Sequence, residues 1–454
     1  MIMNRRAFLS TTSAGLAAMA TFPGGWSCHH QFSKPLTYPF RPYRSGQTLG
    51  KVYQVTPSDG FYTNTYYDVC PWSPSGRYLA VTRMPYQNRI TVMGDTAEVC
   101  VINLEEQSIR AVYRTRCWGY QLGGNLHWGN SDRFLYTNDV IDNQHAVGIR
   151  IDLESEEVLA LAGPQYDVDP RRETIIGPTL EFLNTTQYSY GPPAATADRS
   201  SFEQLPPGAA TDEGLWETNV KTGQKQLLIS LQKAAAHLSD PDFYQNGTFY
   251  LFHTKYSPDG EKIMLVLRYP FLPKTGKKAR NPVLLTCDRS GKNIREVVSR
   301  ERWAQGGHHP TWHPDSQRII MNLTPTWLGD GTLRFCQFNA DGSNFNVLST
   351  EHTGSGHPSI TPDNHYLLAD AYPMEKEFAT DDGEVPIRLL DLTTQEEQTI
   401  CTIFTRLDYG MSRFWGPSKL DAHPVWSRDY QQVCFNGAPE GNRQVLIADL
   451  SQVL

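Results

Sequence analysis

Four histidines occupy the same place in a repeated segment of this sequence, and imidazole is a side chain that both binds metals and transfers protons. The place lies three residues before an aromatic or apolar residue that precedes a turn rich in Ser, Pro, Asp and Gly. It is filled, in chain order, by Val69, Asn125, Gln165, His253, His309, His357 and His423. The chain has 13 histidines among 454 residues, so chance does not account for four at one repeated place. We predict a metal or catalytic site here; the alternative is a place that merely favours a hydrogen-bonding side chain.

A carboxylate accompanies the last histidine of this set. Asp421 precedes His423 by two residues, and in an extended strand side chains two residues apart point to the same side. The same rule predicts opposite directions for the adjacent residues His308 and His309. Imidazole suits several divalent ions, whereas a carboxylate beside imidazoles favours a harder one. We therefore expect one divalent ion, with Mn²⁺ favoured and Zn²⁺, Fe²⁺, Ni²⁺ and Ca²⁺ as alternatives.

Two arginines lie at the end of a strand that returns to the histidine side of the repeat. Arg83 and Arg268 each precede a proline by two residues. A fixed guanidinium above a metal site is suited to holding a carboxylate by paired hydrogen bonds. Either arginine is therefore a candidate for binding an acidic substrate, and the alternative for each is a solvated surface side chain.

The elements that position these residues follow from the repeat itself, a strand, a tight turn and a second apolar strand. The turn segments are Trp72-Ser-Pro-Ser-Gly76, Trp128-Gly-Asn-Ser-Asp132, Val168-Asp-Pro-Arg-Arg172, Tyr256-Ser-Pro-Asp-Gly260, Trp312-His-Pro-Asp-Ser316, Ile360-Thr-Pro-Asp-Asn364 and Trp426-Ser-Arg-Asp-Tyr430. A later apolar strand ending in Asp or Asn also occurs seven times. Seven such units predict an all-β, seven-bladed β-propeller with four-stranded antiparallel blades. We expect residues 31–454 to form this single domain, with Lys51–Val55 as the outer strand of the last blade.

The first thirty residues are typical of an export signal and a linker. Asn4-Arg5-Arg6-Ala7-Phe8-Leu9-Ser10 is similar to a twin-arginine motif, and an alanine-rich apolar stretch follows it. This stretch is too short for a membrane span, so we expect none in the mature protein. The sequence predicts export to the periplasm or beyond, and the residues before Cys28 do not favour its lipidation.

Charge and cysteine spacing exclude other functions. The formal net charge is −7 and no basic stripe occurs, which argues against a nucleic-acid partner. The eight cysteines include no Cys-x-x-Cys pair, and several lie in strand-like runs, so they are expected to be small buried residues. A cysteine-bound zinc is not expected, and the sequence does not indicate an oligomeric state.

The histidine-bearing repeats resemble those of oligogalacturonate lyases. The matching segments are His253-Thr-Lys-Tyr-Ser-Pro-Asp259, His309-Pro-Thr-Trp-His-Pro-Asp315, His357-Pro-Ser-Ile-Thr-Pro-Asp363 and Asp421-Ala-His-Pro-Val-Trp-Ser-Arg-Asp429. Lyases of this family are seven-bladed propellers that hold Mn²⁺ and cleave uronic-acid oligomers by β-elimination. The resemblance implies a general base at His253, metal ligands at His309 and His423, and a place for His357 in the same site.

The chain departs from the family pattern at three positions. Asp421 stands where the family has a second histidine, Ser418 where it has a glutamine, and Gly214 where it has an arginine. The metal shell and the substrate are therefore expected to differ in detail.

The chemistry of a carbon–oxygen lyase suits these residues. The proton next to a uronate carboxylate is weakly acidic, so a metal and an arginine must neutralise the carboxylate while a neutral histidine removes the proton. We assign the histidine role to His253 and the arginine role to Arg268 or Arg83, with an acidic oligosaccharide as substrate. The alternatives are a metal-dependent carbohydrate enzyme with another reaction, and a non-catalytic propeller, resembling TolB-type repeats, that binds carbohydrate or protein.

Overall fold

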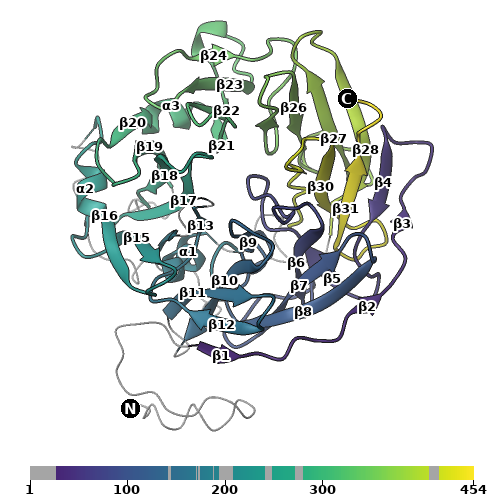
Figure 1. Ribbon diagram of the computed structural model, residues 1–454. Helices are drawn as coiled ribbons and strands as arrows, with labels where there is room; N and C mark the ends of the chain where they lie inside the picture. The colour runs from purple at the N-terminus through teal and green to yellow at the C-terminus, as the bar shows by residue number, and fades with distance from the viewer. Residues whose placement is uncertain are drawn as a thin grey trace.

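Seven antiparallel sheets form a ring around a central axis (Figure 1). The computed structural model describes residues 27–141, 145–169, 171, 174–187, 189–193, 208–240, 248–270, 280–407 and 419–454. Each sheet contains four strands that follow one another from the axis to the rim, and three sheets have a fifth strand. The predicted seven-bladed β-propeller is confirmed.

The strands are short, and each blade takes them from one stretch of chain except the last. Blades 1 to 4 contain β5 (Phe61–Thr63), β6 (Tyr78–Met84), β7 (Ala97–Asn103) and β8 (Ser108–Thr115); β9 (His127–Trp128), β10 (Phe134–Ile141), β11 (His145–Asp152) and β12 (Glu157–Ala160); β13 (Asp167–Val168), β14 (Thr174–Pro178), β15 (Gly214–Asn219) and β16 (Lys225–Ser230); and β17 (Tyr250–Tyr256), β18 (Lys262–Arg268), β19 (Val283–Asp288) and β20 (Arg295–Val298).

The remaining blades complete the ring. Blades 5 to 7 contain β21 (Gly307–Trp312), β22 (Arg318–Leu323), β23 (Arg334–Asn339) and β24 (Asn346–Val347); β25 (Ser359–Ile360), β26 (Tyr366–Ala369), β27 (Glu384–Asp391) and β28 (Glu397–Phe404); and β29 (Val425–Trp426), β30 (Gln432–Gly437), β31 (Gln444–Asp449) and β4 (Lys51–Gln54). Short helices lie in the connections, namely α1 (Leu180–Thr186), α2 (Leu231–Ala235), α3 (Arg300–Ala304) and the 3-10 helix η3 (Thr326–Leu328).

The ring is closed by a strand from the N-terminal part of the chain. Strand β4 pairs antiparallel with β31, with Val52 opposite Ala448, as predicted for Lys51–Val55. In Figure 1 this purple strand lies beside the yellow C-terminal strands. The segment before it adds the fifth strands: β1 (Ser27–His29) pairs with β12, β2 (Leu36–Thr37) with β8, and β3 (Arg41–Pro42) with β4. The two ends of the propeller are thus joined in one sheet.

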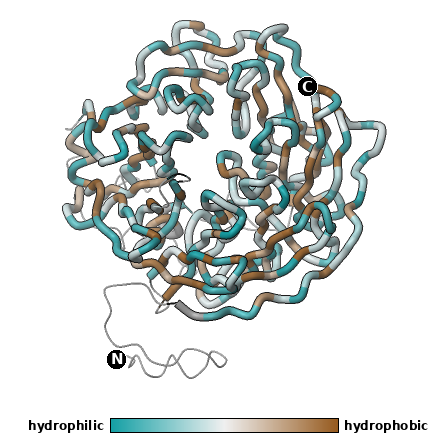
Figure 2. Tube along the Cα trace, viewed as in Figure 1, coloured by the Kyte–Doolittle hydropathy of each residue, from teal (hydrophilic) through white to brown (hydrophobic). Residues whose placement is uncertain are grey.

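Apolar side chains fill the spaces between neighbouring sheets. Figure 2 shows brown apolar residues along the strands and teal hydrophilic residues in many of the loops. The tryptophans that precede the repeated turns, Trp72, Trp128, Trp312 and Trp426, are all buried. Seven cysteines have side chains that the structure describes. Six of these are also buried, and the seven form no disulfide, as expected for small core residues. Within the same residues, no helix has the length and apolar character needed to span a membrane.

Closure of the ring can be tested at neighbouring positions of β4. Val52 is 3% exposed and packs with Leu368 and Ala448 of blades 6 and 7, whereas Lys51 is exposed. Val52→Asn buries an amide without a partner and removes apolar contact, so it should lower the free energy of unfolding by about 3 kcal/mol or more. Lys51→Asn, the matched control, should change it by about 0.5 kcal/mol or less. Denaturant unfolding of both variants checks this; equal stability would contradict closure by this strand.

Candidate metal centre

The innermost strands of blades 4 and 5 are interrupted where their histidines lie. The backbone takes the left-handed conformation at His253 (φ +53°), His309 (+56°) and His423 (+47°), and Asn125 in blade 2 does the same (+54°). Pairing with the second strand shifts register at His253 and His309. Since side chains alternate only along an extended chain, this break allows consecutive residues to face the same way.

The prediction that His308 and His309 point to opposite sides is therefore wrong. Their Nδ1 atoms lie 2.9 Å apart and their rings make an edge contact. Burial and the nearby His357 lower the pKa of His308 to about 4. His308 is thus a neutral neighbour of the site that alternation in an extended strand had excluded.

Asp370 holds two of the candidate ligands in place by hydrogen bonds. This carboxylate is fully buried and accepts hydrogen bonds from the backbone N–H of His357 at 2.7 Å, from His357 Nδ1 at 2.9 Å and from the backbone N–H of His423 at 3.1 Å. The left-handed residue of blade 6 is Gly356, where any Cβ would collide with this carboxylate. Asp370 therefore joins blades 6 and 7, places the imidazole proton on Nδ1 of His357 and leaves Nε2 as a free acceptor.

Sequence reasoning missed Asp370, although a signal was present. It lies 13 residues after the ring position of its own blade, and four other blades carry a polar residue at the same offset: Thr82, Asn138, Asn322 and Asn436. Each of these bonds to the inner segment of the next blade, through Gly124, Gln165, Gly356 and Asn64. Blade 6 alone among these five has a carboxylate at this offset, and its oxygens accept from the His357 ring and from two backbone N–H groups.

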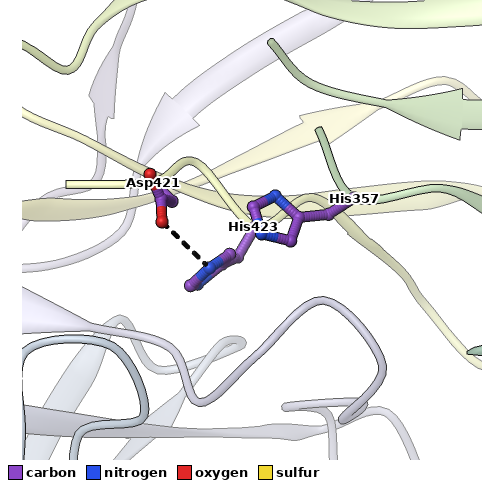
Figure 3. Close-up of side chains that lie close together, drawn as sticks. All are labelled: His357, Asp421 and His423. Atoms are coloured by element: carbon purple, nitrogen blue, oxygen red, sulfur yellow. Dashed lines mark ion pairs between the residues drawn. The ribbon is translucent and has the colours of Figure 1, made fainter. Parts of the chain in front are cut away.

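Three of the predicted metal residues converge beside Asp370. One ligand atom from each of His357, Asp421 and His423 lies within 4.8 Å of the others, and all three side chains are buried. Figure 3 shows the two rings and the carboxylate, with the 3.8 Å contact between His423 Nε2 and Asp421 Oδ2 marked. His357 Nε2 and both ring nitrogens of His423 are buried without a hydrogen-bond partner among the described residues. Such atoms are costly to bury unpaired, so this donor set fits a divalent ion.

The electrostatics agree with this assignment. Burial, His357 and the cations Lys419 and Arg443 hold the pKa of His423 well below its usual value, so its ring is neutral, as metal binding requires. Lys419 Nζ lies 3.1 Å from Asp421 Oδ2. Burial alone would lower the pKa of Lys419, but the Asp421 carboxylate raises it. A permanent cation therefore stands beside the ligand carboxylate.

His309 lies next to this group but is not within the same 4.8 Å set. Its ring centroid is 4.0 Å from that of His357, and its Nδ1 donates to the carbonyl of Gly356 at 2.8 Å, so Nε2 is the acceptor that remains. Burial and the imidazoles of His357 and His308 hold the pKa of His309 well below its usual value. The structure thus brings all four predicted metal residues together, with His309 at the edge.

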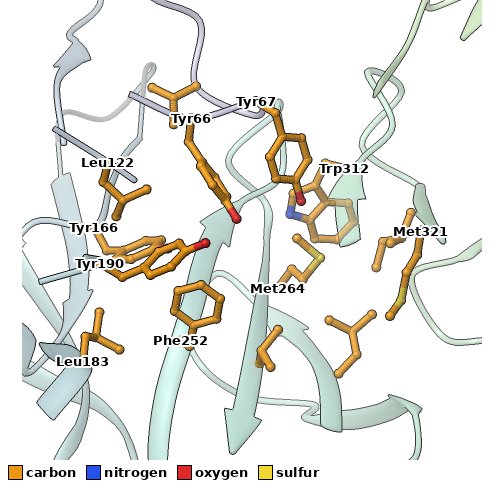
Figure 4. Packing of buried hydrophobic residues seen from close by; sticks show 14 of the residues in the cluster. Tyr66, Tyr67, Leu122, Tyr166, Leu183, Tyr190, Phe252, Met264, Trp312 and Met321 are labelled. Carbon is orange, nitrogen blue, oxygen red and sulfur yellow. The ribbon is translucent and has the colours of Figure 1, made fainter. Parts of the chain in front are cut away.

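His253 is separated from the metal residues by two tyrosines that the sequence analysis did not consider. Blade 1 has residues 64–70 between the paired Thr63 and the bonded Pro71, where blade 5 has only two residues between its paired positions. This longer segment carries Tyr66 and Tyr67, which pack with Tyr190, Phe252 and Trp312 (Figure 4). The Tyr66 ring is 5.9 Å from His253 and 4.6 Å from His423. The candidate base therefore lies across the Tyr66 ring from the candidate ligand His423.

The two predicted arginines lie in different surroundings. Arg268 is buried, with its guanidinium 4.3 Å from the ring centroid of Phe252, the neighbour of His253. Arg83 is ion-paired with Glu98 at 3.4 Å and lines a separate surface cavity of about 310 Å³. The structure brings Arg268 to the His253 side of the site and does not bring Arg83 to the histidines.

Two further cations near the site, Arg280 and Lys419, were not predicted from the sequence. Burial and the positive charge of Arg268 lower the pKa of Arg280, and Lys419 lies on the metal side, 3.1 Å from Asp421. Gly214 begins β15 opposite Ser230 and has no side chain to replace the arginine of the lyase pattern. Ser418 lies outside the described residues.

Comparison with known proteins finds similar solved structures but no similar sequence. No known family matches the sequence, and no curated protein does. The structure is similar to that of an oligogalacturonate lyase from Vibrio parahaemolyticus, with a TM-score of 0.62 and 15% identity, covering 92% of this chain and 98% of that one. An oligogalacturonate lyase in complex with manganese has a TM-score of 0.61 and 15% identity, covering 92% and 97%. The predicted resemblance to a lyase-type propeller is confirmed at the level of the fold.

The role of Asp370 can be tested by giving it the residue of the neighbouring blades. Asp370→Asn keeps the size of the side chain and still offers one acceptor to the backbone, but it removes the charge that orients His357. The affinity for Mn²⁺ should fall by about 10- to 100-fold, measured by calorimetric titration. Asp363→Asn, in an exposed turn of the same blade, is the control and should leave Mn²⁺ binding unchanged. Equal affinities in the two variants would show that Asp370 does not organise the centre.

Proposed function

We propose that this protein is a metal-dependent carbon–oxygen lyase that cleaves uronic-acid-containing oligosaccharides by β-elimination. The observation that carries the proposal is the set of three buried, unpartnered imidazole nitrogens on His357 and His423, next to the Asp421 carboxylate. Tight packing and hydrogen bonding of a structural ring would satisfy these atoms. The likeness to two lyase structures, one in complex with manganese, supports the same reading.

The residues divide the reaction between them. A bound divalent ion would withdraw charge from the uronate carboxylate. Arg268, Arg280 and Lys419 supply the positive charge that attracts an acidic sugar and stabilises the charge formed when the neighbouring proton leaves. His253 is neutral, because burial and the charge of Lys255 lower its pKa to about 4, and so it is able to accept that proton. Positioned proton transfer of this kind contributes roughly 10² to 10⁴ in rate.

We assign His357, Asp421 and His423 as ligands, with His309 completing the set. The mixed carboxylate and imidazole shell favours Mn²⁺, since a carboxylate suits harder ions than imidazole alone. Protein purified without chelator should contain about one divalent ion per chain, and elemental analysis identifies it among Mn, Zn, Fe, Ni and Ca.

The reaction is tested by screening uronic-acid oligomers for an unsaturated product, which absorbs in the ultraviolet. Activity should disappear with chelator and return with added Mn²⁺. Oligomers of neutral sugars serve as the control, because they lack the carboxylate that the site must neutralise. Failure of every uronate to give an unsaturated product would exclude the lyase reaction and leave a metal-dependent carbohydrate enzyme of another kind or a binding propeller.

The roles of base and ligand can be distinguished with variants that keep the left-handed backbone conformation. Asparagine tolerates the left-handed conformation, and Asn125 already occupies this place in blade 2. His253→Asn should keep the metal but lose about 10²- to 10⁴-fold in kcat. His423→Asn should lose metal and activity together, and His309→Asn should bind metal more weakly. Normal turnover by His253→Asn would exclude His253 as the base.

We also propose that the chain is exported to the periplasm or beyond by the twin-arginine route. The support is the Asn4–Ser10 motif, which lies outside the described residues. Replacement of Arg5 and Arg6 by lysine keeps the charge but should abolish twin-arginine export, whereas it should leave general secretion intact. Fractionation of cells expressing both forms gives the answer, and unchanged export would refute the proposed route.

A further inference from the structure

A carboxylate outside the predicted site contacts the candidate base. The longer segment of blade 1 carries Asp68, whose Oδ2 lies 3.2 Å from His253 Nε2, and the carbonyl of Pro310 lies 2.8 Å from the same nitrogen. Both groups only accept hydrogen bonds when Asp68 is ionised, so the proton resides on Nε2. The remaining nitrogen, Nδ1, is then the one that accepts a proton.

A buried ammonium group holds this carboxylate in turn. Lys255 Nζ lies 3.3 Å from Asp68 Oδ1 and 4.0 Å from Asp167 Oδ1, and its side chain is 5% exposed. The Lys255 ammonium also lies 5.5 Å from the ring centroid of Tyr166. A buried carboxylate needs such a partner, because an uncompensated charge in the interior is strongly destabilising.

Two members of this charged group lie two residues after the ring position of their blades. Lys255 follows His253 by two residues, and His127 follows Asn125 by two. Together with Asp68 and Asp167 they line a cavity of about 220 Å³ that none of the candidate metal ligands lines. His127 Nδ1 lies 3.3 Å from Asp167 Oδ1. Asp68 is therefore reached from a cavity that is distinct from the metal centre.

We propose that Asp68 is the positioning residue for His253: together with the Pro310 carbonyl it holds the proton on Nε2, it presents Nδ1 to the substrate, and it balances the charge that forms when the ring is protonated. The ion pair with Lys255 holds the Asp68 carboxylate in place. The role of His253 as base rests on the proposed lyase function, whereas its pairing with Asp68 does not. In the part of the chain that the structure describes, the other polar groups that face His253 are Arg268 from β18 and the phenols of Tyr66, Tyr67 and Tyr166.

Asp68→Asn and Lys255→Met should shift the pKa of His253 in opposite directions. Lys255 has only donors, so it takes the amide oxygen of the new asparagine, and the amide NH₂ then faces Nε2 and disfavours its proton. NMR of protein labelled in its histidines should show the Nε2–H form in the native chain and a rise of the Nδ1–H form in Asp68→Asn. The pKa of His253 should fall in Asp68→Asn, which loses a neighbouring negative charge, and rise in Lys255→Met, which loses a positive one. His253→Asn assigns the signal.

Asp167→Asn is the matched control. Asp167 lines the same cavity and contacts Lys255, but it makes no contact with His253 among the described residues. It should leave the Nε2–H form unchanged. An unchanged tautomer and pKa in Asp68→Asn would overturn the proposal, as would shifts of the same sign in Asp68→Asn and Lys255→Met.

Turnover provides a second, independent measurement. Asp68→Asn should lose about 10²- to 10⁴-fold in kcat with little change in KM or metal content, because a wrongly protonated imidazole cannot accept the proton. Formate should partly restore Asp68→Ala, since the cavity gives a small carboxylate access to the vacated place. Full activity in Asp68→Asn would overturn the positioning role. The NMR changes without cleavage of any uronate would support the pairing and overturn the lyase reaction alone.

Discussion

The left-handed break in the innermost strands is the constraint on which the site depends. A non-glycine residue in this conformation is destabilised by about 1–3 kcal/mol, and His253, His309 and His423 all adopt it. Hydrogen bonds between blades offset this cost. Asp370 of blade 6 accepts from the backbone N–H of His423, and the rings of His253 and His309 bond to the carbonyls of Pro310 and Gly356 in the next blade. Closing the ring makes all of these bonds available together. The histidines are therefore held at the axis by the assembly of the propeller and not by their own strands.

One difference at the repeated polar position, 13 residues after the ring position, distinguishes the metal side of the ring. Where blades 2, 5 and 7 have an asparagine, blade 6 has Asp370, which bonds the backbone of its neighbour and also the His357 ring. A structural link between blades thus becomes a carboxylate that fixes the tautomer of a ligand. The cations around the centre then act on a rigid arrangement of neutral imidazoles and one carboxylate.

The longer segment of blade 1 places two aromatic rings between His253 and the metal residues. Tyr66 and Tyr67 lie between His253 and the metal residues, and Asp68 reaches the far side of His253. Because aromatic rings exclude water from both sides, the charges on Lys255 and Lys419 act on different histidines at low local dielectric. This separation lets one ring of histidines contain both metal ligands and a residue of distinct acid–base character.

The sequence alone determined the seven blades, the closing strand, the ring position and the neighbourhood of Asp421, because each follows from a local repeat of strand, turn and strand. The offset of 13 residues would also have revealed Asp370 as a member of a repeated polar position. Only the tertiary structure decided that His308 joins His309, that Arg83 stays apart, and that Asp68 reaches His253. Those outcomes depend on a break in strand alternation and on contacts between blades. Alternation describes an extended strand only, and distances between residues far apart in the chain are set when the ring closes.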